Sequence, residues 1–410
     1  MDAVAPPSSA RHIVLGSSAV SNSCPLCGSA KLFLVLERTN VPVHQNRPFP
    51  TAEAARADGR GDLRIECCQS CGFVTNSLFS EKLLRYEAGY ENDQTYSAVF
   101  DQHVESLLAR LVQERGVRDL EIVEVGCGGR GQFLERFCAR GENRGIGFDP
   151  AYVGEPRSTD GRVRFVQEYY GEKFADVPAD VVICRHVIEH VPAPLDLLTA
   201  IHSALRSKPR ARLFFETPAI DWIFDNLVIQ DFFYEHCSYF TDESLRYAFR
   251  TAGFNPVSVE RIFGDQYLWI EAVYDPSVPP DLSLPSTDSI LAAAEKFSAR
   301  EKERSARLLA MVVRLRAEGP VAIWGAGAKG VTFANHLDAG SELIDCVIDI
   351  NPRKQGGFLP GTGHPIVGPE DLRPRSIANV IVLNPNYTAE INAFVQANDL
   401  RIGVHTESEA

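Results

Sequence analysis

The sequence predicts an α/β protein built around a doubly wound, Rossmann-like parallel sheet. A small cysteine-rich domain precedes this sheet, and a second, smaller Rossmann-like α/β domain follows it. Three observations lead to this fold class. At 410 residues the chain exceeds what one hydrophobic core usually supports. Two C-x-x-C pairs lie near the N-terminus, and two segments of the form strand, glycine turn, helix follow, EVGCGGRGQF and IWGAGAKGVTF.

The composition argues against a nucleic-acid-binding protein and against a membrane-spanning protein. The chain has 54 acidic and 41 basic residues and a formal net charge of -13, which argues against a nucleic-acid-binding surface. No apolar run approaches the roughly 20 residues that span a bilayer, and the N-terminus has no long apolar block after a basic one. We therefore expect a cytoplasmic enzyme, a monomer or small homo-oligomer without nucleic-acid or membrane partners. Residues 1–20 are expected to form a disordered tail.

Residues 21–80 are predicted to form a zinc-binding domain. Five of the ten cysteines fall within the first 71 residues, in the motifs CPLCG and CCQSCG. Two thiolates on each glycine-closed turn supply the four soft ligands of a structural zinc, here Cys24, Cys27, Cys68 and Cys71. Cys67 competes with Cys68 for one position, and the two-residue gap favours Cys68. The alternative is a set of ordinary buried thiols.

Residues 81–275 are predicted to form the first Rossmann-like domain. Residues 82–115 look wholly or partly helical, and the stretch 254–274 resembles late antiparallel strands. Between them, strands alternate with helices, which is typical of a parallel sheet. The predicted strands lie in LEIVEVG, RGIGFDPAY, VRFVQEYYG, ADVVICRHVIEHV and RARLFFETPAI.

The first glycine turn, EVGCGGRGQF, predicts a ribose-containing ligand. It follows a strand and opens a helix, and Asp149 ends the next strand, in the place of an acid that binds ribose hydroxyls. A dinucleotide site normally has the form G-x-G-x-x-G. Here Glu124 precedes the first glycine by two residues, which gives the form E-x-G-x-G instead.

Residues 276–318 are predicted to be a Pro-rich linker and a helix from about Ile290 to Glu318, and residues 319–410 the second α/β domain. Its turn fits G-x-G-x-x-G with Gly325, Gly327 and Gly330, and Asp349 ends the next strand. This pattern alone indicates a dinucleotide site. The domain has only about 90 residues, one mononucleotide half, so we favour a role in substrate binding or structure.

Two residues of the second α/β domain are candidate substrate ligands. Lys329 begins the helix after the glycine turn, where it could meet a phosphate. Asn384, in the segment NPNY, is expected at a strand end that faces the same cleft.

These motifs, in this order, resemble the sugar C-methyltransferases that act on nucleotide-linked keto-sugars. The resemblance rests on the E-x-G-x-G turn, the stretch ADVVICRHVIEHVPAP and the segment YEHCSYF, and it covers about residues 24 to 395. It implies a class I S-adenosylmethionine-binding methyltransferase domain over residues 81–275 and a C-terminal domain that completes the substrate cleft. The implied cofactor residues are Glu124, Gly126, Gly128 and Asp149. Gly129 and Gly131 compete for the third glycine position, and Gly131 is our candidate.

The resemblance also implies catalytic residues. The family segment Y-x-E-H-x-x-Y-F contributes a tyrosine, a glutamate and a histidine that serves as the general base. Glu235 and His236 match it, and Tyr239 matches its later tyrosine as a candidate substrate ligand. The first tyrosine position falls on Phe233, with Tyr234 one place later as the candidate phenol.

Further family residues lie outside that segment. The family histidine after the fourth strand matches His190. A family tyrosine ahead of the sheet corresponds to Tyr90 or Tyr96, and both are candidate substrate ligands.

The expected reaction is C-methylation by S-adenosylmethionine. His236 would remove a proton next to a ketone of a nucleotide-linked sugar, and His190 would hydrogen-bond the developing enolate oxygen. Glu235 could orient His236 directly only if the backbone turns between them. One alternative is methylation of oxygen or of a non-sugar metabolite. For His236 itself, the alternative is a structural histidine. Another is a non-catalytic zinc-knuckle binding protein.

Overall fold

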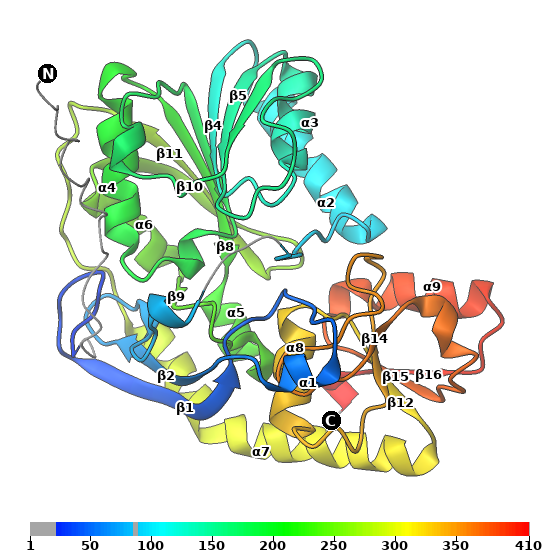
Figure 1. Cartoon of the computed structure of the whole chain (residues 1–410). Coiled ribbons are helices and arrows are strands. Elements are labelled where there is room, and N and C mark those ends of the chain that lie inside the picture. Colours follow the sequence, from blue (N-terminus) through cyan, green and yellow to red (C-terminus); the bar gives the residue numbers. More distant parts are fainter. Residues whose placement is uncertain (1–21, 85–88, 410) are drawn as a thin grey trace, which may run out of the picture.

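The computed structural model describes residues 22–84 and 89–409, and it contains three sheets. Figure 1 shows a seven-stranded sheet in the upper half, an N-terminal sheet at the lower left and a C-terminal sheet at the lower right. The predicted α/β class with two Rossmann-like sheets is confirmed. The predicted tail, residues 1–20, lies outside the described residues.

The seven-stranded sheet has the order β10-β11-β8-β7-β4-β5-β6. The strands from β8 to β6 are parallel, and β11 pairs antiparallel with both β8 and β10. Chain order reverses at β4, so the carboxyl ends of β4, β5 and β7 form the crevice where open α/β sheets bind ligands. The strands are β4 (Glu121–Val125), β5 (Arg144–Phe148), β6 (Val163–Val166), β7 (Val181–Arg185), β8 (Arg212–Pro218), β10 (Phe254–Ile262) and β11 (Tyr267–Tyr274).

Helices cover both faces of this sheet, which is why its strands are apolar on both sides. Ile122 of β4 packs with residues of α2 and α3, whereas Val123 packs with residues of α4 and α6. These helices are α2 (Ala98–Ala109), α3 (Gln132–Gly141), α4 (Pro194–Ala204) and α6 (Asp242–Thr251). The helical expectation for residues 82–115 is correct only in part, because α2 begins at Ala98 and ends in a π-helical turn, Arg110–Glu114.

The N-terminal sheet has the order β1-β2-β3-β9 and is antiparallel. Its strands are β1 (Leu32–Pro42), β2 (Arg60–Cys68), β3 (Val74–Asn76) and β9 (Ser238–Tyr239), and the short helix α1 (Ala52–Arg56) lies in the β1–β2 connection. The last strand comes from the segment after β8, far along the chain. Two pairs, Val74 with Tyr239 and Thr75 with Ser238, join it to β3.

The C-terminal sheet is a five-stranded parallel sheet with the order β14-β13-β12-β15-β16. Its strands and helices are β12 (Val321–Trp324), β13 (Cys346–Ile348), β14 (Ile366–Val367), β15 (Asn379–Val382), β16 (Gly403–Thr406), α8 (Ala328–Leu337) and α9 (Thr388–Ala397). The predicted long helix is confirmed as α7 (Asp288–Glu318), which runs beneath both smaller sheets in Figure 1.

One apolar core joins the two smaller sheets. It combines residues of β1 and β2, of the helix α5 (Ile220–Asp225), of α7 and of the C-terminal sheet. A second core joins Cys68, at the end of β2, to Val123 and Leu213 of the seven-stranded sheet, so the three sheets are packed parts of one structure. Within the described residues, no helix has both the length and the apolar character that crossing a bilayer requires.

Candidate functional site

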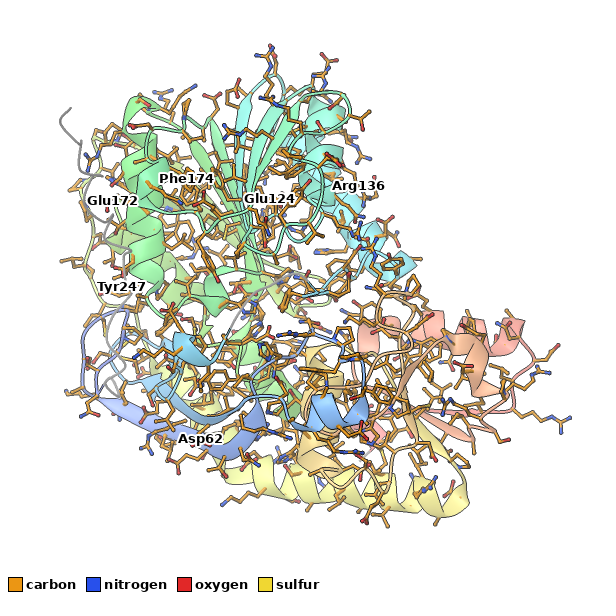
Figure 2. All side chains as sticks on the ribbon, viewed as in Figure 1. Asp62, Glu124, Arg136, Glu172, Phe174 and Tyr247 are labelled. Carbon is orange, nitrogen blue, oxygen red and sulfur yellow. The ribbon has the colours of Figure 1, made fainter. Side chains whose placement is uncertain are left out.

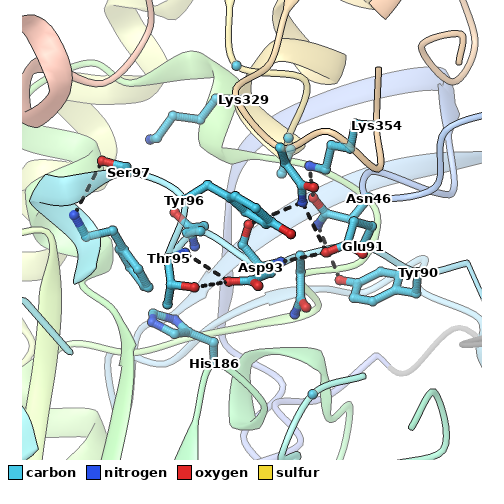
Figure 3. A pocket seen from close by; sticks show the side chains of 18 of the residues that line it. Asn46, Tyr90, Glu91, Asp93, Thr95, Tyr96, Ser97, His186, Lys329 and Lys354 are labelled. Atoms are coloured by element: carbon cyan, nitrogen blue, oxygen red, sulfur yellow. Dashed lines mark hydrogen bonds between the residues drawn. The ribbon is translucent and has the colours of Figure 1, made fainter. Parts of the chain in front are cut away.

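A cleft of about 690 Å³ lies where the three sheets meet. Its volume is within the range of small-molecule and cofactor sites. Its walls are the carboxyl ends of β4 and β7, the second glycine turn, and the segment 89–97, which runs across the opening (Figure 3). The cleft therefore brings together the two glycine turns and the segment that carries His236.

The first glycine turn joins β4 to α3. Gly126, Gly128 and Gly131 all have positive φ, at +73°, +72° and +64°. A Cβ atom on Gly126 would lie 2.1 Å from Val187, and one on Gly131 would lie 2.0 Å from Phe165. A Cβ on Gly128 would meet no described atom within 4 Å. Packing requires the first and third glycines, and the second leaves its backbone open to a ligand.

Gly131, and not Gly129, takes the third place in this turn. Gly131 caps the N-terminus of α3 in the left-handed conformation. Gly129 lies within the turn, where its carbonyl accepts a hydrogen bond from the Val153 amide at 3.0 Å. The extra residue in GGRGQFL is accommodated inside the turn.

Asp149 ties the turn to the end of β5. Its Oδ2 accepts the N–H of Gly128 at 2.9 Å, and its Oδ1 accepts the N–H of Ala151 at 2.8 Å. Burial raises the pKa of Asp149, although these two amides favour the ionised form. Glu124 lies among the buried side chains at the middle of the sheet (Figure 2), and burial raises its pKa to about 8.

Glu235 is fully buried and joins two other parts of the chain. Its Oε1 accepts the N–H of Gln45 at 2.7 Å, and its Oε2 accepts the hydroxyl hydrogen of Tyr90 at 2.8 Å. The backbone does turn here, since the His236 N–H bonds the Phe233 carbonyl at 3.3 Å. Both Glu235 oxygens nevertheless bond Gln45 and Tyr90. The carboxylate therefore fixes the backbone position of the segment that carries His236, and does not orient the His236 ring.

His236 lines the cleft beside a second histidine. Its ring centroid lies 4.7 Å from that of His190, nearly perpendicular to it, and 4.1 Å from that of Phe233. One side-chain nitrogen or oxygen from each of Glu189, His190 and His236 lies within 4.8 Å of the others. Burial, reinforced by positive charge on His190 and His186, holds the pKa of His236 well below its usual range. His236 is therefore a neutral imidazole at neutral pH and can accept a proton.

Four cysteine sulfurs gather at the edge of the N-terminal sheet. The Sγ atoms of Cys24, Cys27, Cys68 and Cys71 lie within 4.8 Å of one another, with contacts of 3.6 Å between Cys24 and Cys71 and 3.5 Å between Cys27 and Cys68. A tetrahedral zinc with bonds of about 2.3 Å fits a group of this size. Cys67 belongs to a different apolar cluster, so the structure groups Cys68, and not Cys67, with the other three.

Comparison with known proteins identifies two domains in the chain. Residues 100–259 match the family described as methyltransferase domain, and residues 289–401 match the C-methyltransferase C-terminal domain. Over 391 residues the chain is 26% identical to the C-methyltransferase NovU of Streptomyces niveus, covering 90% of this chain and 91% of that protein. The chain is an S-adenosylmethionine-dependent methyltransferase with a C-methyltransferase C-terminal domain.

Other proteins similar to this methyltransferase match a smaller part of it. A ubiquinone biosynthesis O-methyltransferase of Pseudoalteromonas translucida is 33% identical over 108 residues, 25% of this chain and 45% of that protein. The solved 1,6-didemethyltoxoflavin-N1-methyltransferase of Burkholderia thailandensis is 22% identical, with a TM-score of 0.32, and covers 43% of this chain and 81% of that one. The solved magnesium protoporphyrin IX methyltransferase of Synechocystis is 18% identical, with a TM-score of 0.35, and the match covers 43% of this chain and 84% of that one.

The structure does not bring Tyr234 to the cleft of the methyltransferase. Its hydroxyl accepts the N–H of Ser80 at 2.9 Å, and its ring packs so closely on Gly61 that a Cβ there would lie 2.2 Å away. Phe233 lines the cleft instead. Adjacent side chains point in opposite directions at this position, so the position of Tyr234 does not support its expected role as the catalytic phenol.

Tyr239 also differs from expectation. It is only 1% exposed, in β9, and its ring centroid lies 5.5 Å from that of Phe232 and 6.0 Å from that of His236. It forms part of the aromatic wall behind His236 and is not among the residues that line the cleft. The direct substrate contact expected for Tyr239 is therefore not supported by its position.

The other candidate substrate ligands do line the cleft. Tyr90 and Tyr96 both come from the segment 89–97, and Tyr96 is 39% exposed. The Lys329 ammonium pairs with the Asp231 carboxylate. Gln266 and the Asn384 amide exchange two hydrogen bonds, of 2.9 Å and 3.0 Å. Of these four side chains, Tyr96 is the most open to a ligand.

The sequence interpretation missed Lys354 at the second glycine turn. Lys354 is only 5% exposed, and its Nζ donates to the Ala326 carbonyl at 3.2 Å and lies 3.8 Å from Asp349. Asp349 itself accepts the N–H groups of Ala326 and Asn351 at 2.9 Å and 2.8 Å. These two bonds repeat those of Asp149 in the first turn. The signal for Lys354 was its place five residues after this strand-end acid.

Proposed function

We propose that this methyltransferase methylates a carbon next to the ketone of a nucleotide-linked keto-sugar. The observation that carries the proposal is the neutral, half-buried His236 that faces the same cleft as both glycine turns. Transfer of a methyl group to carbon requires a carbon nucleophile, and a base beside a ketone can generate one.

His236 is the proposed general base. The C–H bond next to the ketone breaks, its proton passes to the imidazole of His236, and its electron pair becomes the enolate. Bound S-adenosylmethionine would supply the methyl group: as the enolate carbon forms the new C–C bond, the S–CH₃ bond would break, its electron pair would stay on sulfur, and S-adenosylhomocysteine would leave. The imidazolium of His236 then returns its proton to water, which restores the neutral base.

His190 is the proposed donor to the enolate oxygen. Its ring stands edge-on to that of His236 at a centroid distance of 4.7 Å, so both rings can meet one small acceptor. The bonds of Glu235 to Gln45 and Tyr90 keep the backbone of the His236 segment fixed while the proton moves.

The first glycine turn is the proposed site of the methyl donor. The open backbone at Gly128 and the strand-end carboxylate of Asp149 suit a nucleoside. We assign Glu124, Gly126 and Gly131 to the support of this turn. We also propose a structural zinc at the four clustered cysteines.

The second glycine turn is the proposed binding site for the nucleotide part of the acceptor. Asp349 repeats the hydrogen bonds of Asp149. Lys354 and Lys329, which contact Asp349 and Asp231 respectively, place two ammonium groups on the same wall. A diphosphate is attracted by such charge. The acceptor class that fits both the enolate chemistry and this wall is a keto-sugar carried on a nucleoside diphosphate.

The test is hydrogen exchange at the acceptor, measured in D₂O by mass spectrometry with S-adenosylhomocysteine bound. Nucleotide-linked keto-sugars should exchange a proton next to the ketone, and His236→Asn should abolish this exchange and methyl transfer while retaining affinity for S-adenosylhomocysteine. His202→Asn is the matched control, because His202 lies on α4 against Tyr274 at 4.9 Å, outside the cleft. Absence of exchange in the unmodified enzyme with every keto-sugar tested would refute the proposal.

A further inference from the structure

The stretch 186–190 contains two histidines, His186 and His190. The proposed mechanism gives a role to His190 but none to His186. It is the first residue after β7, at the strand edge where the ligand crevice lies. It lines the cleft with 23% of its side chain exposed. Figure 3 shows it at the wall below the segment that carries Thr95 and Tyr96.

The backbone of His186 is held in an unusual conformation. Its φ is +53°, in the left-handed region, and its N–H donates to the Glu216 carbonyl at 2.9 Å. For a residue other than glycine this conformation is strained, and it persists where the surroundings fix it. It turns the His186 side chain from the sheet toward the cleft.

Two buried carboxylates hold the imidazole, but neither takes a short hydrogen bond from it. Nδ1 of His186 lies 3.4 Å from Glu189, and Nε2 lies 3.6 Å from Glu216. Both distances exceed the ordinary range of about 2.7–3.2 Å. Despite its burial, these carboxylates raise the pKa of His186 to about 9. The ring is therefore charged at neutral pH. Its Nε2 is buried, so Nδ1 is the nitrogen that can donate to a ligand in the cleft.

Neutralisation of Glu216 does not require His186. The Glu216 carboxylate is fully buried, and it already has contacts of 2.6 Å with His103 and 2.7 Å with Arg185. Those two partners make the short bonds that a buried carboxylate needs. His186, at 3.6 Å, is an additional cation that faces the cleft.

His186 is also coupled in space to the proposed base. The carbonyl of Glu189, three residues after His186, accepts the N–H of Cys237, the residue that follows His236. The stretch 186–190 and the segment of the base are thus fixed to each other. His186, His190 and His236 all line the same cleft.

We propose that His186 donates a hydrogen bond to the acceptor's carbonyl oxygen as negative charge develops on it, and is thus a catalytic residue beside His190. This inference rests on the proposed function. Stabilisation of an oxyanion by two fixed donors is worth most where water is excluded. His186 would supply the charged donor of the pair, and its proton would stay on the imidazole throughout.

The test compares His186→Gln with His103→Gln, since both histidines contact Glu216 but only His186 lines the cleft. Exchange of the acceptor proton in D₂O should slow about 100-fold in His186→Gln, the cost of one oxyanion donor, and less than threefold in His103→Gln. Equal effects of the two changes would overturn the inference. If the two changes have equal effects but the unmodified enzyme exchanges the proton normally, the proposed function stands. If the unmodified enzyme shows no exchange, the proposed function itself is refuted.

A second measurement does not depend on whether the variants fold. Because the charged form of His186 is required, exchange by the unmodified enzyme should fall as the pH rises through about 9. A rate that stays level up to pH 10 would overturn the inference. The ionisable groups of the elements around this ring are Arg185, Glu189, His190, His103, Glu216, His236 and Tyr267.

Discussion

Two glycines of the first turn have similar backbone angles but different surroundings. Gly131 is packed against Phe165, so a methyl group there would overlap the ring. Gly128 faces open space beside Asp149. The same substitution at these two positions therefore separates a role in folding from a role in ligand binding.

Gly131→Ala should lower the free energy of unfolding by about 3 kcal/mol, since overpacking and left-handed strain add. Gly128→Ala should cost only about 1 kcal/mol of strain, but should weaken binding of S-adenosylhomocysteine at least tenfold. Urea unfolding and calorimetry measure the two quantities. Equal loss of stability in both variants would contradict the distinction.

Local sequence patterns predicted the glycine turns and the strand-end acids, because these depend on residues close in the chain. They could not predict the partners of Glu235. Gln45 and Tyr90 are 190 and 145 residues away in sequence. For the same reason the orientation of Tyr234 was wrong, since contacts with Gly61 and Ser80 decide which aromatic side chain faces the cleft.

At the scale of elements, β9 links the catalytic segment to the cysteine cluster. β9 pairs with β3, and Cys71 and Gly72 lie in the turn between β2 and β3. Alternation of strands and helices predicted the parallel sheets, and apolar residues at helical spacing predicted α7. A two-residue strand paired with a distant sheet has no such local signal. Loss of order in the cysteine cluster should therefore reach the His236 segment through β3.

Cys68→Ser should remove the bound metal, expected at about one zinc per chain, and should lower the melting temperature and kcat together. Cys67→Ser is the matched control, because Cys67 is equally buried and adjacent but its sulfur lies outside the cluster. Metal content by mass spectrometry and thermal unfolding give the comparison. Full metal content in Cys68→Ser would refute the assignment.

At the scale of the whole molecule, the segment 89–97 connects the parts that form the cleft. Glu91 accepts a hydrogen bond from Asn351 at 3.1 Å, and its own N–H donates to the Asn46 carbonyl at 2.7 Å. Ser97 donates to Glu390 of α9 at 2.6 Å. Opposite walls of one cleft thus come from domains that hold two similar glycine turns.

Asp149→Ala and Asp349→Ala should each weaken binding of a different ligand. Calorimetry should show that the first loses S-adenosylhomocysteine but retains a nucleoside diphosphate, and that the second does the reverse. The expected loss is at least tenfold in each case, because both carboxylates fix their turns through two amide bonds. Binding of NADPH that depends on Asp349 would instead assign the second turn to a dinucleotide.

The placement of β9 also limits how enzymes of this architecture can exchange parts. A chimera that joined the N-terminal sheet of one protein to the remainder of another would combine β3 with a foreign β9. Altered pairing with the foreign strand would change the position in the cleft of the histidine that corresponds to His236. Such an exchange would succeed only if residues 229–240 came from the same protein as the N-terminal sheet. This segment must match the strand β3, which lies far upstream in the chain.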